Sequence, residues 1–411
     1  MAVSSCRLCG ARLKETFIDL GMSPLANSYV QLEQLSSVEP CYPLHARVCG
    51  SCYLVQLDEV ASSHKTFLDY AYFSSYSDTW LKHAQDYTEQ MVTRFDLNPS
   101  SMVVEVASND GYLLQYFQAK KIPVLGIEPA ANVATVAQEK GIPTRVTFFG
   151  SQTAKELVRD NTRADLLIGN NVLAHVPDLN DFVGGLKLLL KPHGIITMEF
   201  PHLLPLIQET QFDTIYHEHL CYFSLFPVER LLGSHGLTLF DVEQLPTHGG
   251  SLRIFARHQE HPARPITEAV RHIHCLEERF GLTRLETYRR FTDQVHDSKR
   301  RILELLTRAK DQGHTIVGYG APAKGNTLLN YCGIGTDFIS FTVDRSPHKQ
   351  GRFLPGTHIP IEHPDRVREV KPDFVFILPW NLKDEIMQQL AYIRDWGGQF
   401  LVPIPVPRVY P

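Results

Sequence analysis

The sequence lacks an excess of basic residues, and this absence argues against whole classes of partner. Its 411 residues include 40 lysines and arginines against 45 aspartates and glutamates, for a formal net charge of −5. Without a strong basic field the chain has little to attract a nucleic acid or an anionic lipid surface. We therefore expect no nucleic-acid partner, and any phosphate group must be held by a few local residues.

Long apolar runs are absent as well. No stretch approaches the length of a membrane span, and the first ten residues lack the apolar core of a signal peptide. A cytoplasmic protein without a membrane partner is the expectation. The length predicts two to four domains rather than one.

The eight cysteines are not spread like a disulfide framework. Half of them form two C-x-x-C pairs, which are Cys6 with Cys9 and Cys49 with Cys52. Four thiolates in a reducing compartment suit a tetrahedral zinc ion, and such a site has no open position, so the metal would be structural. Two unrelated pairs of free thiols, or a redox dithiol, are the alternatives.

Short apolar runs alternate with helical patterns beyond residue 102, which predicts a mainly parallel sheet covered on both faces. The predicted strands are 103–106, 124–127, 165–168 and 194–199, and the predicted helices are 112–118, 130–140 and 179–190. A long helical region at about 266–311 follows, and a second, smaller α/β unit begins near residue 315. Its further strands are predicted at 338–343, 374–378 and 399–402.

The turn after the first predicted strand is a candidate cofactor loop, although it is not G-x-G-x-x-G. Glu128, about twenty residues further on, ends the second strand and is placed to accept hydrogen bonds from two ribose hydroxyls. This acid-loop-acid spacing resembles the S-adenosylmethionine site of class I methyltransferases, although Ala107 stands where that fold usually has glycine. The candidate cofactor-binding residues are Glu105, Ala107, Ser108, Asn109, Asp110, Gly111, Glu128, Pro129, Asn170 and Asn171.

A second strand-loop-helix, at residues 315–326, combines glycines with a lysine. Loop amides and a mobile ammonium group together suit a diphosphate, and the loop after the next strand adds more cations. An ordinary surface turn with solvated lysine and arginine is the alternative. The candidate substrate-binding residues are Tyr319, Ala321, Lys324, Gly325, Asn326, Lys349 and Arg352.

Four consecutive residues, Tyr216-His217-Glu218-His219, bring a phenol, two imidazoles and a carboxylate together. Imidazole titrates near neutrality, so this cluster is suited to moving a proton. A purely structural set of buried hydrogen bonds is the alternative. The tyrosine-rich stretch 69–77 either lines a polar pocket or packs between domains.

In this order, the motifs resemble the sugar carbon-methyltransferases that act on nucleotide-linked 4-keto-deoxysugars, and the resemblance covers essentially the entire chain. It implies an α/β protein: a zinc module (1–62), a Rossmann-like class I methyltransferase domain (63–265), and a long helix with a second Rossmann-like α/β domain (266–411). S-adenosylmethionine and structural zinc would be the cofactors. The partner would be a thymidine diphosphate sugar, and the protein a monomer or homodimer.

The resemblance implies that His219 is the general base that removes the proton from the ring carbon beside the ketone, which forms an enolate. Candidates to stabilise that enolate are Tyr216, His175, Glu218, Tyr70 and Tyr76. Three rival readings remain: a methyltransferase acting on oxygen or nitrogen, a zinc-bearing nucleic-acid-binding protein, and a sugar-nucleotide dehydrogenase or epimerase.

Overall fold

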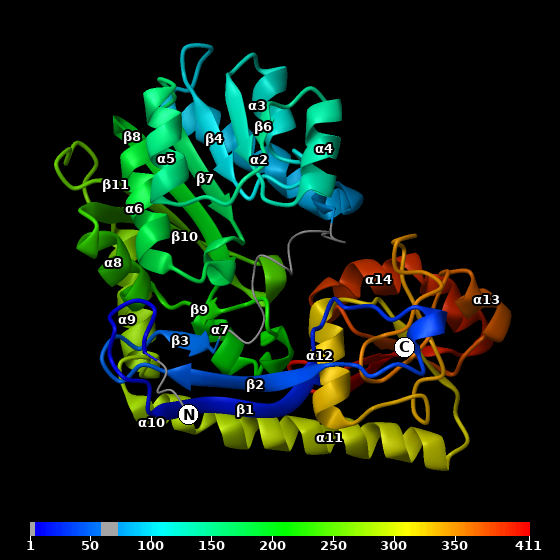
Figure 1. The fold of residues 1–411 in the computed structure, drawn as a ribbon. Coiled ribbons are helices and arrows are strands. Elements are labelled where there is room, and N and C mark those ends of the chain that lie inside the picture. The colour runs from blue at the N-terminus through cyan, green and yellow to red at the C-terminus, as the bar shows by residue number, and fades with distance from the viewer. Residues whose placement is uncertain (1–4, 59–72) are drawn as a thin grey trace.

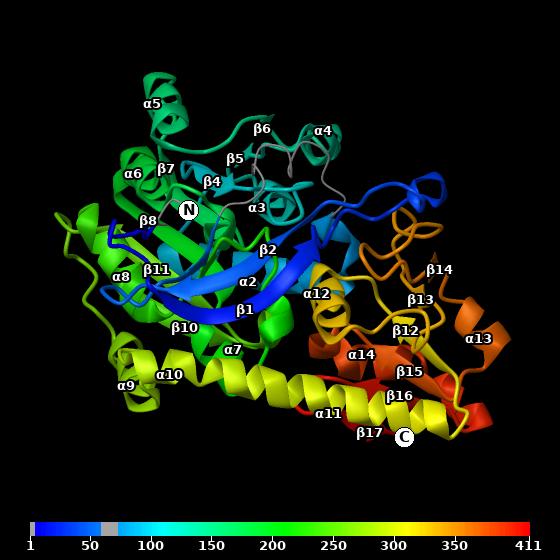
Figure 2. The same ribbon diagram turned by 60° about the horizontal axis from the view of Figure 1, so that its bottom comes forward.

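The computed structural model describes residues 5–58 and 73–411, and three β-sheets organise them (Figure 1). A seven-stranded central sheet and its helices form one lobe, and a six-stranded C-terminal sheet forms the other. A four-stranded N-terminal sheet and a long helix run along both lobes (Figures 1 and 2). Within the described residues, no helix combines the length and apolar character needed to cross a bilayer.

The central sheet has the strand order β10-β11-β8-β7-β4-β5-β6. Strands β4 to β8 are parallel, whereas β11 is antiparallel to both of its neighbours. Strand order reverses between β4 and β7, and ligands of such sheets bind beyond the carboxyl ends of the strands at this point. The bounds are β4 Val103–Val106, β5 Val124–Ile127, β6 Thr144–Arg145, β7 Ala164–Asn170, β8 Leu190–Pro201, β10 Leu237–Leu245 and β11 Ser251–His258.

Successive apolar residues of each central strand face opposite sides, so both faces of the sheet need covering. Val103 packs in the core beneath α2, α3 and α4, and Val104 packs in the core beneath α5, α6, α8 and α9. The parallel sheet covered on both faces, predicted from the sequence, is confirmed. These helices are α2 Asp78–Phe95, α3 Leu114–Ala119, α4 Ala131–Glu139, α5 Ser151–Arg159, α6 Leu179–Leu189, α8 Leu225–Ser234 and α9 Glu268–Phe280.

The C-terminal sheet has the order β14-β13-β12-β15-β16-β17, parallel except for β17. Its order also reverses, between β12 and β15. The strand predicted at 338–343 is only two residues long, because residues 335–339 form a turn in which Ile339 donates to the Gly335 carbonyl. The bounds are β12 Ile316–Tyr319, β13 Thr342–Val343, β14 Ile361–Glu362, β15 Phe374–Ile377, β16 Gln399–Val402, β17 Arg408–Tyr410, α12 Ala323–Cys332, α13 Arg366–Val370 and α14 Lys383–Gln389.

The N-terminal sheet was not expected from the sequence. It consists of β1 Glu15–Pro24, β2 Cys41–Val48, β3 Val55–Leu57 and β9 Cys221–Tyr222, all antiparallel. Because β9 directly follows the Tyr216–His219 cluster, its pairing with β3 holds that cluster against the N-terminal segment. On the other side, Phe17 of β1 stacks on Phe291, with ring centroids 4.5 Å apart.

The helical region predicted as one long run at 266–311 is divided into three helices. Gly281 ends α9 in a left-handed conformation, with φ of 99°, and α10 Leu285–Arg289 and α11 Phe291–Asp311 follow. Helix α11 buries one apolar face, including Val295, Ile302 and Leu306, and reaches along the C-terminal lobe (Figure 2). The domain boundaries drawn from the sequence stay a prediction.

Candidate active site

The loop after β4 bends through left-handed backbone conformations at alternate residues. Ala107, Asn109 and Gly111 have φ of 58°, 49° and 75°. This conformation is sterically strained for alanine and asparagine but not for glycine, and strained backbone residues are common at functional sites. The loop therefore keeps the shape of a glycine-rich turn without having glycine at its first position.

The predicted partner of this loop, Glu128, lies directly against it. One carboxylate oxygen accepts from the Asn109 amide and the other from the Ala130 amide, each at 2.9 Å. Burial raises the pKa of Glu128, which the two backbone hydrogen bonds oppose. Loop and acid, nineteen residues apart, thus meet at the edge of the sheet where the strand order reverses.

Several buried polar atoms beside this loop have no hydrogen-bond partner within the described residues. They are the Ser108 hydroxyl, one Asp110 carboxylate oxygen and both amide atoms of Asn170. Burial also raises the pKa of Glu105 well above its usual range. Unsatisfied buried polar groups are costly, so a ligand with several donors and acceptors fits this edge. The amino-acid and ribose groups of S-adenosylmethionine meet that requirement.

His219 is held by two hydrogen bonds that define its tautomer. Its Nδ1 lies 3.0 Å from the Thr214 carbonyl, which only accepts, so Nδ1 carries the hydrogen. Nε2 is then the unprotonated nitrogen and accepts from the Tyr216 hydroxyl at 2.7 Å. Thr214 ends the short helix η4, Phe212–Thr214, which precedes the cluster.

Burial, and then the neighbouring charge of His175, hold the pKa of His219 well below its usual range. The rings of His175 and His219 meet edge to face, with centroids 4.9 Å apart, and burial lowers the pKa of His175 to about 4. Both imidazoles are therefore neutral at physiological pH. A neutral His219 has a lone pair available to take a proton.

Glu218 contacts the N-terminal segment, because Asn27 donates to its carboxylate at 2.6 Å. Burial raises the pKa of Glu218 to about 7. His217, the remaining member of the cluster, faces the Pro43 carbonyl at 3.3 Å. Tyr216 and His219 therefore lie together with His175, whereas the side chains of Glu218 and His217 turn to the N-terminal segment.

The two tyrosines proposed upstream do not add to this cluster. Tyr70 lies outside the described residues. Tyr76 is 56% exposed, and its hydroxyl lies 3.4 Å from the ring of His348 in the C-terminal lobe. Phe73 stacks on the same imidazole at 5.5 Å, so residues 73–76 contact the C-terminal lobe rather than His219.

His248 joins the site although sequence reasoning missed it. It lies in the turn between β10 and β11, has φ of 56°, and its Nε2 accepts from the Asn171 side chain at 3.2 Å. Burial lowers the pKa of His248 to about 4. The signal was present in the sequence as Thr247-His248-Gly249-Gly250, a histidine directly before two turn glycines.

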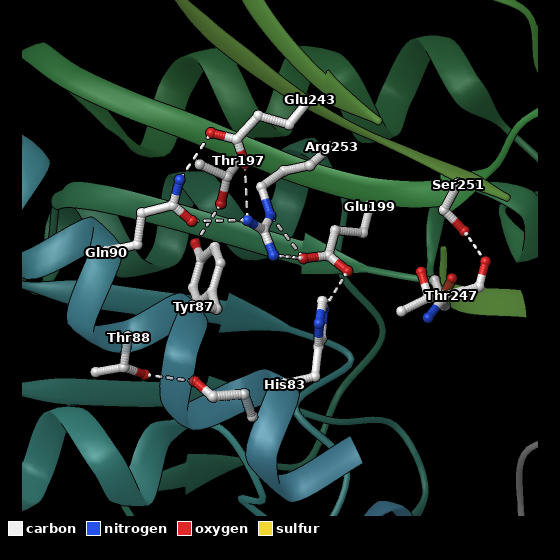
Figure 3. A network of polar contacts seen from close by, with 12 residues as sticks. His83, Tyr87, Thr88, Gln90, Thr197, Glu199, Glu243, Thr247, Ser251 and Arg253 are labelled. Carbon is white, nitrogen blue, oxygen red and sulfur yellow. Dashed lines mark hydrogen bonds and ion pairs between the residues drawn. The ribbon is translucent and has the colours of Figure 1, made fainter. Parts of the chain in front are cut away.

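A buried ion-pair network lies behind this turn (Figure 3). Arg253 contacts Glu199 through Nε at 2.7 Å and Nη2 at 2.6 Å, and His83 contacts the other Glu199 oxygen at 2.8 Å. Trp80 stacks on His83 at 4.8 Å and lies 5.4 Å from the His248 ring. Helix α2, β8 and β11 are thereby joined next to the candidate site.

Lys324 is not the mobile cation expected from the sequence. Its ammonium group donates to Asn381 and lies 4.5 Å from the centroid of the Trp380 ring. Trp380 in turn donates from its indole nitrogen to Asp213 at 2.7 Å. Burial lowers the pKa of Lys324 to about 8, and burial raises the pKa of Asp213 to about 6.

Most of the other predicted substrate-binding residues already make contacts within the protein. The Lys349 ammonium lies 2.9 Å from the Ala321 carbonyl and 3.5 Å from Asp344, so it serves the fold. Asn326 donates to the Ala26 carbonyl, Gly325 packs on Leu378, and the Tyr319 hydroxyl contacts Gln389. The guanidinium of Arg352 has no hydrogen bond or ion pair within residues 5–58 and 73–411.

The two C-x-x-C pairs come together as one cluster. The Sγ atoms of Cys6, Cys9, Cys49 and Cys52 all lie within 4.8 Å of one another. Gln56 of β3 donates to Cys6 at 3.2 Å, and the Ser51 amide donates to Cys49 at 3.4 Å. Four convergent thiols with amide donors around them fit a tetrahedral metal ion.

Comparison with known proteins agrees with this arrangement along the whole chain. Three family models match in succession: a zinc binding domain (6–67), a methyltransferase domain (80–242) and a C-methyltransferase C-terminal domain (246–405). The C-methyltransferase NovU from Streptomyces niveus is 36% identical over 99% of this chain and 97% of its own. The chain belongs to the C-methyltransferase family.

Other matches cover only part of this C-methyltransferase. The ubiquinone biosynthesis O-methyltransferase of Rhodopseudomonas palustris is 25% identical over 26% of this chain and 44% of its own. Magnesium protoporphyrin IX methyltransferase from Synechocystis, solved with bound SAM, covers 43% of this chain and 78% of its own, with 15% identity and a TM-score of 0.33. A TM-score this low supports no conclusion about the structure or function of this chain.

Three parts of the C-methyltransferase meet at the segment 215–219, which carries His219. The central sheet contributes His175, Asn171 and His248, the N-terminal segment contributes Asn27, and the C-terminal lobe contributes Lys324. Thr327 of α12 donates to the Ile215 carbonyl at 3.1 Å and thereby ties the C-terminal lobe to the segment that carries the histidine. The candidate base therefore lies where all three sheets converge.

Proposed function

We propose that this enzyme transfers a methyl group from S-adenosylmethionine to the ring carbon beside the ketone of a nucleotide-linked 4-keto-deoxysugar. The observation that carries the proposal is the state of His219: its Nδ1 is committed to the Thr214 carbonyl, which leaves Nε2 unprotonated and facing the Tyr216 hydroxyl. A carbon nucleophile needs such a base because its hydrogen is only weakly acidic.

The proposed reaction begins with a proton transfer from the sugar to His219. Nε2 of His219 takes the proton from the carbon beside the ketone, the C–H electron pair forms a carbon–carbon double bond, and the carbonyl π pair moves to oxygen. Tyr216, which donates to Nε2 before the substrate binds, shifts its hydrogen bond toward the new oxyanion. S-adenosylmethionine, when bound, would supply the electrophilic methyl group: as the enolate carbon accepts it, the carbon–sulfur bond would break and the sulfonium would leave as a neutral thioether.

The cofactor is assigned to the edge formed by residues 107–111, Glu128 and Asn170. Glu128 has lone pairs beyond those used by the Asn109 and Ala130 amides, and these suit ribose hydroxyls. The unpartnered atoms of Ser108, Asp110 and Asn170 suit the amino-acid and ribose groups. Zinc is assigned to the four-cysteine cluster, where it is structural because all four positions are thiols.

The sugar nucleotide is assigned to the face between the two lobes. Arg352 follows β13 and has no ion pair within the described residues, so it is the best candidate to bind the diphosphate. Lys349 is committed to Asp344 and Ala321 and supports that loop instead. The thymidine base and the 4-keto group come from the resemblance to the sugar carbon-methyltransferases.

The test is mass spectrometry after incubation with labelled S-adenosylmethionine and a panel of thymidine diphosphate 4-keto-deoxysugars. Label is expected on carbon in the product, and solvent deuterium is expected to enter the carbon beside the ketone when the methyl donor is absent. His219→Asn should abolish both while leaving the dissociation constant for S-adenosylmethionine within about threefold. Label on oxygen or nitrogen, without deuterium exchange, would show that a different atom is methylated.

A further inference from the structure

Lys324 lies at the topological switch point of the C-terminal sheet. It is the second residue of α12, the helix after β12, while Trp380 and Asn381 follow β15. The strand order reverses between these two strands. Ligand-contacting groups of α/β sheets are placed at this position. In this enzyme the same position faces the segment 212–219 of the central lobe, because Thr327 of α12 bonds to the Ile215 carbonyl.

The neighbours of Lys324 belong to the reaction site. Asp213 precedes Thr214, whose carbonyl holds His219, and it is bonded to the Trp380 indole. The charge of Lys324 contributes to the lowered pKa of both His219 and His248, after burial as the main cause. Trp380 also approaches the histidine turn so closely that a Cβ on Gly249 would lie 2.6 Å from its ring.

A diphosphate-binding role suits Lys324 poorly. The Asp213 carboxylate lies close enough to raise the pKa of Lys324 against the effect of burial, and it would repel a nearby diphosphate. The ammonium group has three hydrogens, and Asn381 is its one hydrogen-bond acceptor among the described residues. Two hydrogens are therefore available for a single oxygen that gains charge during the reaction.

We propose that Lys324 is a catalytic residue of the methyl transfer, whose ammonium group contacts the carbonyl oxygen of the sugar and stabilises the enolate. The proposal rests on the proposed function, since it requires a ketone substrate. When His219 takes the carbon-bound proton, the carbonyl π pair moves onto oxygen, and Lys324 donates a hydrogen bond to it while keeping all of its protons. The carbonyl re-forms when the carbon accepts the methyl group.

The state of this ammonium group depends on pH. The titratable groups that face it are Asp213 on η4, His219 after the same turn, and His248 on the β10–β11 turn. Burial lowers the pKa of Lys324 to about 8, so it loses its charge above that pH while both histidines stay neutral. Enolate formation should therefore decline on the alkaline side, and an arginine at this position should keep its charge there.

The experiment compares Lys324→Met, Lys324→Arg and Arg352→Met with Lys310→Met, an exposed lysine on α11, as the control. Two quantities are measured on the full chain: the rate of solvent deuterium incorporation beside the ketone at saturating sugar nucleotide, and the dissociation constant for thymidine diphosphate alone. Lys324→Met should slow exchange about 100-fold or more and leave thymidine diphosphate binding within about threefold. Arg352→Met should weaken that binding about tenfold or more.

The Lys324→Arg variant separates a catalytic role from a structural one. Its rate of solvent deuterium exchange should be maintained to a higher pH than that of the wild type, which a structural role does not predict. If Lys324→Met loses its fold by circular dichroism, Lys324→Gln replaces it in the same assays. The proposal is overturned if either neutral variant exchanges at the wild-type rate, or if it weakens thymidine diphosphate binding while exchange at saturation survives. Failure of the proposed function is separate, since the wild type itself would then show no exchange.

Discussion

Replacing Arg253 with methionine should destabilise the central lobe by about 3–5 kcal/mol at pH 7.5. The guanidinium makes two contacts to Glu199, at 2.7 and 2.6 Å, and further bonds to Glu243 at 2.9 Å and Gln90 at 3.0 Å (Figure 3). The side chains of Arg253 and Glu199 are only 4% and 1% exposed. Removing one partner of a buried ion pair leaves an uncompensated charge, which costs about 3–5 kcal/mol.

The cost should depend on pH in a defined direction. Burial alone would raise the pKa of Glu199, but the His83 hydrogen bond and the Arg253 charge outweigh it, and the folded-state pKa is lowered. In the wild type this carboxylate therefore stabilises the fold above its unfolded pKa, and that contribution is lost as the pH falls through the folded pKa. In Arg253→Met burial should dominate and raise the pKa, so the penalty should shrink as acid neutralises Glu199.

Urea unfolding at pH 7.5 and pH 5, followed by tryptophan fluorescence, measures both effects. The double variant Arg253→Met with Glu199→Gln should recover at least about half of the loss, because no buried charge remains. Arg271→Met is the matched control: its pair with Glu268 is exposed at 65% and 81%, and its removal should cost under about 1 kcal/mol. A pH-independent loss in Arg253→Met, or no recovery in the double variant, would refute the reasoning.

Three further changes test other parts of the site. Glu128→Ala removes the carboxylate assigned to the ribose and should weaken S-adenosylmethionine binding about tenfold or more, as measured by equilibrium dialysis. An unchanged affinity would show that the ribose does not bind to Glu128. Cys49→Ser should lower bound zinc in elemental analysis together with the melting temperature, whereas Cys41→Ser, an exposed cysteine outside the cluster, should change neither. Ala107→Gly removes the steric strain of an alanine in a left-handed backbone conformation and should raise the free energy of unfolding by about 0.5–1 kcal/mol. A lower free energy of unfolding would show that packing of the Ala107 methyl group outweighs this strain.

Local patterns in the sequence were sufficient for much of the central sheet. Strands β4 and β5 have the predicted bounds, because short runs such as Val103-Val104 must be buried on both faces whatever else the chain does. The pairing of residues 107–111 with Glu128 was also predictable, since neighbouring parallel strands end at the same edge. The four cysteines followed from spacing and thiolate chemistry alone.

Other features were beyond local patterns. The break at Gly281 was missed because a single glycine within a helical pattern is tolerated as often as it ends a helix. The strand at 338–343 is shorter than its apolar residues suggested, because a turn at Gly335 uses part of the segment. Tyr76 was a candidate to stabilise the enolate formed by His219, yet its contact is with His348 from a distant part of the chain.

The sequence by itself determined the α/β class, the meeting of residues 107–111 with Glu128, the cysteine cluster and the short segment that contains His219. Only the tertiary structure decided which distant groups surround that histidine: β3 pairs with β9, Asn27 reaches Glu218, and Lys324 comes beside Asp213. The physical reason is the separation along the sequence of the residues that interact. Periodicity and turn chemistry act between residues a few positions apart, whereas these contacts join segments more than a hundred residues apart and depend on how whole sheets bury their faces against one another.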